Sequence, residues 1–320
     1  FILIMHLRLG LLGTIASIIS AFLFQLLFYL RLVVLELHEG IRWDYVKEWL
    51  KASFLNLYGI VGQRLLALTY ILLFVYGGEL ARAYYGAAST IAGVIGYSSF
   101  LAYALYPRLL SEKRPEDVPV SLKMVLTFAI PMTIGAIVLS ESFLIILNPV
   151  YAAARLALML LSLNSLCLTL SSISDAIIGG TEELDAKAKI SHRDIARSRL
   201  FLNLTLPYVQ AAVIVPLTYI VTTSVAEDAA EAATLLALIN LLASTVMAVA
   251  KIKIARKYLA FHVPWASIGK YLAASVLMAA VLWLLPTPTR ILTTLASTFL
   301  GSLIYLVVLS VVDIETRRTA

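Results

Sequence analysis

Apolar stretches, each near or above twenty residues long, recur along almost the whole chain. A helix of that length crosses the roughly 30 Å hydrocarbon core of a bilayer. Within such a helix the backbone polar groups can bond to one another where no water is present. Charged residues make up 14% of this chain and hydrophobic residues 61%, whereas charged residues approach about a quarter of an ordinary soluble domain. The sequence therefore predicts an all-α polytopic membrane protein.

The apolar stretches predict about nine spanning helices. They cover residues 9–35, 50–76, 83–109, 121–147, 153–178, 200–222, 230–252, 267–285 and 290–312. Glycine, asparagine and proline lie at the short connections 77–78, 148–149 and 286–288, where they favour turns. Helices joined by so few residues lie antiparallel. We therefore expect hairpins of spans two and three, four and five, and eight and nine.

The basic residues predict the topology. Of the 25 Lys and Arg residues, all but five fall in clusters that alternate with nearly uncharged gaps. The clusters are Arg31/Arg42/Lys47/Lys51, Arg108/Lys113/Arg114/Lys123, Lys187/Lys189/Arg193/Arg197/Arg199, Lys251/Lys253/Arg256/Lys257/Lys270 and Arg317/Arg318. Cytoplasmic loops are enriched in Lys and Arg, so these clusters place their loops and the C-terminus of the chain in the cytoplasm.

The predicted cytoplasmic loops are residues 36–49, 110–120, 179–199 and 253–266. The loop at 179–199 carries mixed charge and could form a short helix on the membrane surface. The first residues then lie outside, as an odd number of spans requires. The predicted location is the cytoplasmic membrane of the cell, with multiple passes.

Composition also argues against several function classes. The net charge of +6 lies in short loops rather than on one face, so we expect contact with anionic lipid headgroups and not with nucleic acid. Cys167 is the single cysteine and the four histidines are scattered, so we expect neither a disulfide nor a metal site. The chain lacks GxxxxGK[ST], HExxH and GxSxG motifs, so enzyme chemistry is not expected. No cofactor is predicted beyond a possible coupling ion, Na⁺ or H⁺, and we expect a monomer.

Span two carries polar residues that a helix facing only lipid would not need. At about 100° per residue, Asn56 and Gln63 nearly eclipse each other and Arg64 lies about 80° away, so all three share one face. Arg64 falls near the middle of its span, too deep for easy snorkelling. Two interpretations are open: the guanidinium binds backbone carbonyls or a carboxylate of a neighbouring helix, or it lines a water-filled cavity that receives an anionic substrate.

Span five is the second polar helix. Asn164, Ser171 and Asp175 fall on one stripe, at spacings of seven and four. Most hydroxyls of this span are expected to bond to the carbonyl four residues earlier. Asp175 precedes the Gly179-Gly180 break, and its role is open between a mouth residue, a proton- or sodium-coupling carboxylate and an interfacial carboxylate.

Span six places Asn203, Pro207 and Gln210 on one face, with Pro216 further along. Proline removes a backbone hydrogen bond and bends a helix. Bent helices are common where transporters change access from one side to the other. Pro207 and Pro216 are therefore candidates for gating, and structural bends are the alternative interpretation.

Several stretches together resemble one known family. They are residues 45–76, the run at 83–109 with the pattern Y-x-A-A-x-T-I…L-x-P-x-L, the run KMVLTFAIPMTIGAIVLSESFLIILNPVYAAA with its P-x-Y-x-x-A end, and HVPWASIGKYLAASVLMAAVLWLLP. In order and spacing they resemble the polysaccharide-biosynthesis flippases of the multidrug/oligosaccharidyl-lipid/polysaccharide exporter (MATE-like) superfamily. The resemblance covers roughly residues 45–312.

This resemblance implies a fold of fourteen helices in two six-helix lobes that form a V, plus two extra helices. Residues 1–48 would hold the last helix of the N-terminal lobe and a cytoplasmic linker, residues 49–256 the C-terminal lobe, and residues 257–320 the two extra helices and a tail. The chain opens on Phe1 in apolar sequence, and we expect about five more spans to precede it.

The resemblance also implies a function. Such proteins flip isoprenoid-linked oligosaccharides across the membrane by alternating access, and their cavities are commonly cationic to match the carrier's pyrophosphate. The resemblance assigns the binding of the pyrophosphate to Arg64, with Asn56 and Gln63 as candidates to face the sugars. The rest of the predicted cavity consists of Asn164, Asp175, Asn203 and Gln210. The alternatives are a cation-coupled drug or metabolite antiporter of the same fold and a membrane glycosyl polymerase or ligase, for which the outer loops are short.

Overall fold

The structure is a computed structural model that describes residues 10–34, 43–112, 114–182 and 198–312. The described residues form helices and connections, with no strand among them. Eight of these helices are long and apolar enough to cross a membrane. The chain is therefore an all-α, multi-pass membrane protein, as the apolar stretches predict.

The chain divides into two units, residues 1–51 and residues 52–320. In the first unit, α1 (Gly10–Val34) has apolar side chains on all sides, and only Arg31 in its last turn is charged. A helix that is apolar all round is typical of a membrane span. The helix α2 (Trp43–Gly93) begins in this unit, inside the segment expected to be a loop, and continues into the second.

The chain reverses direction at Gly78, within α2. Gly78 adopts φ 85° and ψ 173°, a conformation that only glycine reaches easily. Tyr70 and Tyr85, on either side of this residue, have ring centroids 5.5 Å apart, although fifteen residues of continuous helix would separate them by about 22 Å. The predicted hairpin of spans two and three is therefore present. The apolar element Ser53–Leu109 contains both spans and counts once among the eight, so the number nine stays a prediction.

The second unit continues through helices that cover the predicted spans, some of them divided into shorter elements. They are η2 (Val94–Ala102), α3 (Leu105–Glu112), α4 (Asp117–Val138), α5 (Ser140–Leu147), η3 (Pro149–Ala154), α6 (Arg155–Gly180), α8 (Arg199–Ile220), η5 (Val221–Val225), α9 (Ala229–Tyr258), α10 (Trp265–Leu284) and α11 (Ile291–Val312). Span four is divided at Leu139, whose φ of −92° and ψ of 15° separate α4 from α5.

The helix α6 is the central element of this unit. One apolar core joins it to α3, α4, α10 and α11. A second core joins it to α9 and to α2, with Leu73 before Gly78 and five α2 residues after it. Alanines fill the second core, among them Ala157, Ala232 and Ala233, and small side chains let membrane helices approach closely. Hydroxyls along α6 bond to carbonyls of their own helix, as expected: Ser162 Oγ donates to Leu158 O at 2.8 Å and Thr169 Oγ1 to Ser165 O at 2.8 Å.

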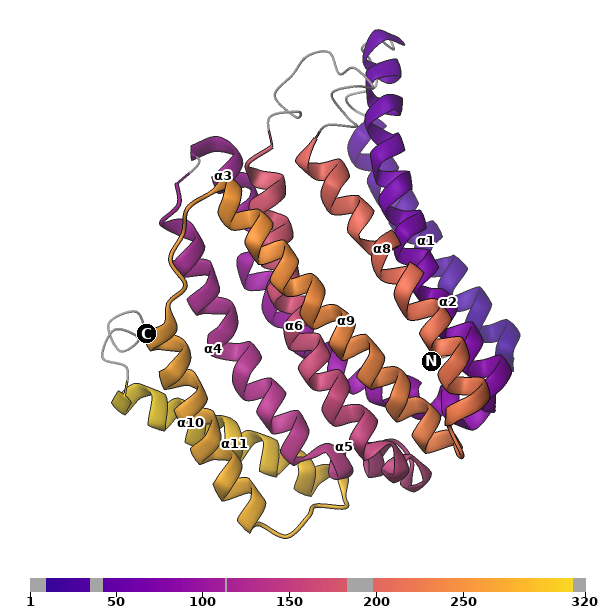
Figure 1. Cartoon of the computed structure of the whole chain (residues 1–320), viewed down its shortest axis with the longest axis vertical. Helices are drawn as coiled ribbons and strands as arrows, with labels where there is room; N and C mark the ends of the chain where they lie inside the picture. Colours follow the sequence, from indigo (N-terminus) through magenta and orange to yellow (C-terminus); the bar gives the residue numbers. More distant parts are fainter. Residues whose placement is uncertain (1–9, 35–42, 113, 183–197, 313–320) are drawn as a thin grey trace. The chain divides into compact units, whose positions relative to one another are not determined.

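The basic ends of the helices in this unit lie on one side. The α3–α4 turn, the end of α6, the beginning of α8 and the end of α9 gather at the top of the view (Figure 1). This arrangement agrees with the alternation of basic clusters, while the identity of that side as the cytoplasmic one stays a prediction.

The predicted loop at 253–266 is wrong in its first half, because α9 continues to Tyr258. Arg256 and Lys257 lie in its last turn, where cations interact favourably with the helix dipole. The possible surface helix at 179–199 falls largely on residues 183–197, which lie outside the described residues.

Candidate functional site

A cavity of about 650 Å³ lies among α2, α6, α8 and α9. Its lining is Asn56, Gly59, Ile60, Gln63, Arg64, Asp175, Asn203, Leu204, Pro207 and Lys251. Polar and charged side chains within membrane-spanning helices are expensive in hydrocarbon and are usually functional. Their concentration on one cavity identifies it as the candidate functional site.

One wall is the face of α2 that carries Asn56, Gln63 and Arg64, which the helical spacing placed together. All three side chains are exposed within the described chain. Arg64 makes no hydrogen bond or ion pair with a described residue. The interpretation of Arg64 as an arginine satisfied by a neighbouring carbonyl or carboxylate therefore finds no support in the described part of the chain.

Close packing of α8 on α2 positions that wall. A Cβ added at Gly59 would lie 2.7 Å from Leu204 Cδ2, so the glycine leaves the space that the leucine occupies. Tyr208 Oη donates to the Tyr58 carbonyl at 2.6 Å, and the two rings stack with centroids 4.5 Å apart. These contacts set the distance between α2 and α8 at the level of the cavity lining.

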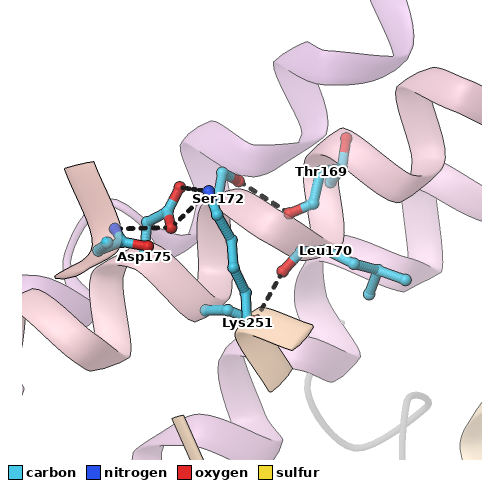
Figure 2. A network of polar contacts seen from close by, with 7 residues as sticks. Thr169, Leu170, Ser172, Asp175 and Lys251 are labelled. Carbon is cyan, nitrogen blue, oxygen red and sulfur yellow. Dashed lines mark hydrogen bonds and ion pairs between the residues drawn. The ribbon is translucent and has the colours of Figure 1, made fainter. Parts of the chain in front are cut away.

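The second polar part of the lining belongs to a network centred on Asp175 of α6 (Figure 2). Lys251 Nζ of α9 lies 2.8 Å from Asp175 Oδ1 and donates to Oδ2 at 2.9 Å. Asn203 Nδ2 of α8 donates to Oδ1 at 2.9 Å. A single carboxylate thus joins three helices through charge-assisted hydrogen bonds, which are stronger than neutral ones.

The cavity carries excess positive charge. Asp175 is matched by Lys251, so the guanidinium of Arg64 is left as unneutralised charge on the lining. Asn203 Oδ1 is buried and has no hydrogen-bond partner, although buried polar atoms are usually paired. The lining therefore combines the available cation of Arg64 with the exposed amides of Asn56 and Gln63, which can form hydrogen bonds with a polar ligand.

Two of the predicted cavity residues do not line it. Asn164 lies eleven residues before Asp175 on α6, about 16 Å along the helix axis, and it is 8% exposed. Gln210 lies seven residues beyond Asn203 on α8, about 10 Å away along the axis. Both lie on the expected helices, but at a different depth from the cavity.

The two prolines of α8 differ in position. Pro207 is buried and lines the cavity, whereas Pro216 is exposed and lies further along. The helix continues past both residues to Ile220 and then into the π-helical turn η5. Their role in gating stays a prediction.

Lys251 is the site residue that the sequence analysis missed, because it was grouped with a cytoplasmic basic cluster. It lies seven residues before the end of α9, and Asp175 lies five residues before the end of the neighbouring α6. An acidic and a basic residue at similar depth on adjacent spans are expected to pair. That signal could have found the pair had the adjacency of α6 and α9 been known.

No group of three or more His, Cys, Asp or Glu side chains among the described residues is arranged to hold a metal ion. Comparisons with protein-family models, with curated proteins and with solved structures give no significant match to this chain.

Proposed function

We propose that this protein is a transporter that flips an isoprenoid (pyro)phosphate-linked oligosaccharide across the cytoplasmic membrane by alternating access, for cell-surface polysaccharide or glycoprotein assembly. The observation that supports it is the cavity on which Arg64 lies beside Asn56, Gln63 and Asn203. An arginine can bind phosphate oxygens with two parallel hydrogen bonds, and amide groups are suited to sugar hydroxyls.

The charges of the lining favour an anionic substrate group. Because Asp175 is held by Lys251 and Asn203, a phosphate entering beside Arg64 meets a carboxylate that is already neutralised. A low local dielectric strengthens the attraction between guanidinium and phosphate. The apolar tail of the carrier would stay in lipid, where it needs no protein pocket.

The experiment is translocation of a fluorescent lipid-pyrophosphate oligosaccharide by the full-length protein in proteoliposomes. Arg64→Ala is expected to abolish most of the transport, and Arg290→Ala, which removes the same charge from the α10–α11 connection, is expected to leave it unchanged. Translocation that survives Arg64→Ala at the wild-type rate would remove Arg64 from the mechanism.

The second candidate function is a cation-coupled antiporter of the same fold. The observation that favours it is the carboxylate of Asp175 on the cavity lining, since coupling ions need acidic residues. Ion-driven dye efflux without lipid-oligosaccharide translocation, lost in Asp175→Asn, would favour this function over the flippase.

A further inference from the structure

A second cavity, of about 350 Å³, lies on another face of α6 and is almost wholly apolar. Side chains of α4, α6, α9, α10 and the α9–α10 connection line it, and none of them belongs to the lining of the first cavity. Its size falls in the range of ligand pockets, about 300–1000 Å³. The lining is Leu122, Leu126, Ile130, Leu166, Leu170, Ile173, Ser174, Ile177, Ile252, Arg256, Phe261, Val263, Trp265, Ile268 and Leu272.

Arg256 is the one charged residue of that lining. Its guanidinium lies 5.6 Å from the centroid of the Phe261 ring and is exposed. It makes no hydrogen bond or ion pair with any residue in the described ranges. The donors of this guanidinium are therefore available to an acceptor outside the protein.

A more open cavity of about 410 Å³ adjoins the apolar one at this arginine. It shares Arg256, Phe261, Val263 and Trp265 with the apolar cavity and adds Ala260 and His262. The α9–α10 connection, which supplies Phe261, His262 and Val263, descends from the basic end of α9 (Figure 1). An apolar pocket thus opens past the guanidinium of Arg256 onto a more polar recess that also contains His262.

We propose that these joined cavities bind a membrane phospholipid with an anionic headgroup. One apolar chain occupies the cavity among α4, α6, α9 and α10, and the headgroup phosphate lies against Arg256. The ligand must be amphiphilic, because the two halves of the site differ in polarity, and anionic, because Arg256 carries the charge at their junction. A guanidinium binds phosphate oxygens bidentately.

The surroundings suit a lipid at the membrane interface. Trp265 is 71% exposed at the mouth, and tryptophan is enriched at the level of the headgroups. Lys253 and Lys257 lie nearby on α9 and are exposed, and basic residues at the cytoplasmic leaflet attract anionic lipids. The proposal does not rest on the flippase function, since it concerns a site with a separate lining.

The test uses quenching of Trp265 by brominated lipids. A chain in which Trp43, Trp49 and Trp283 are replaced by Phe is reconstituted in phosphatidylcholine vesicles and titrated with chain-brominated phosphatidylglycerol or chain-brominated phosphatidylcholine. The anionic lipid is expected to reach half-maximal quenching at a mole fraction about tenfold lower than the zwitterionic one, the factor given by a charge-assisted hydrogen bond.

Two substitutions separate a built site from a diffuse surface attraction. Arg256→Gln is expected to remove the tenfold preference, whereas Lys257→Gln, the adjacent exposed basic residue outside both cavities, is expected to change it severalfold at most. Equal losses in the two variants, or equal quenching by the two lipids in the parent chain, would overturn the proposal.

Ser174→Leu tests the chain-binding half without altering charge. Ser174 is 3% exposed and its hydroxyl donates to Leu170 O of its own helix at 3.1 Å, so the fold is expected to persist by circular dichroism. The added side chain fills the apolar cavity and should raise the mole fraction needed for quenching by the anionic lipid. Unchanged quenching would show that the lipid chain lies elsewhere. In a parallel variant, Trp43, Trp49 and Trp265 are replaced by Phe and Trp283 is kept. Quenching of Trp283 should show no preference for the anionic lipid over the zwitterionic one.

Discussion

The ion pair between Lys251 and Asp175 is expected to stabilise the helix bundle by clearly more than the pair between Arg155 and Glu141. Lys251 is 13% exposed and lies 2.8 Å from Asp175 Oδ1, whereas Arg155 and Glu141 are 52% and 41% exposed and 3.3 Å apart. A hydrogen bond to a charged group contributes about 1.5–3 kcal/mol. Asp175 is 39% exposed, so water recovers part of that free energy, and we expect a coupling of about 1–2 kcal/mol.

A double-mutant cycle measures this coupling. Lys251→Met, Asp175→Leu and the double variant are unfolded in mixed micelles, and the free energies of unfolding are compared with the wild type. The interaction of Asp175 with Asn203 is lost in both Asp175→Leu variants, so it cancels from the cycle. The same cycle with Arg155→Met and Glu141→Leu is expected to give less than about 0.5 kcal/mol.

The reasoning fails if the two couplings are equal, or if the Lys251–Asp175 coupling is indistinguishable from zero. Either result would mean that burial and geometry do not distinguish the cavity pair from the exposed pair. The network of Figure 2 would then not join α6 to α9 energetically.

Two further comparisons test the packing by the free energy of unfolding. Gly180→Ala is expected to lower the free energy of unfolding by about 1–3 kcal/mol, because the added Cβ would lie 2.7 Å from Leu109 Cβ. Gly269→Ala should raise it by about 0.5–1 kcal/mol, because a Cβ added there meets no atom within 4 Å. A similar effect of both would contradict the α3–α6 contact. Tyr208→Phe removes the 2.6 Å hydrogen bond to α2 and should lower the free energy of unfolding by about 1 kcal/mol. Tyr219→Phe should change it little, because the Tyr219 hydroxyl has no hydrogen bond among the described residues. A larger loss in Tyr219→Phe than in Tyr208→Phe would refute the α2–α8 contact.

Much of the helical architecture was predictable because the length of the apolar stretches decides where membrane helices form. A bilayer admits a helix wherever about twenty apolar residues follow one another, so α6, α8, α10 and α11 begin and end close to the expected residues. Helix ends in basic sequence were less predictable. The α9 helix extends beyond its apolar stretch to Tyr258, because lysine and arginine are good helix formers and nothing breaks the helix earlier.

The candidate site was predictable within each helix and not between helices. The face of α2 with Asn56, Gln63 and Arg64 follows from the 100° rotation per residue, and these residues do line one cavity. The pairing of Asp175 with Lys251 depends on which helices are neighbours and on the depth of each residue in the bundle. Hydropathy indicates neither of these. For the same reason, Asn164 was placed on the right helix while its distance along the axis from the cavity was missed.

The central claim is that Arg64 binds the phosphate groups of the carrier in the cavity among α2, α6, α8 and α9. The most direct measurement is the Kd of a short-chain isoprenyl pyrophosphate for the wild type, Arg64→Gln and Arg64→Lys in detergent micelles. Arg64→Gln is expected to raise the Kd by about tenfold or more, the loss of a charge-assisted hydrogen bond, and Arg64→Lys by less, because the charge remains. Equal Kd values for all three proteins would contradict the claim.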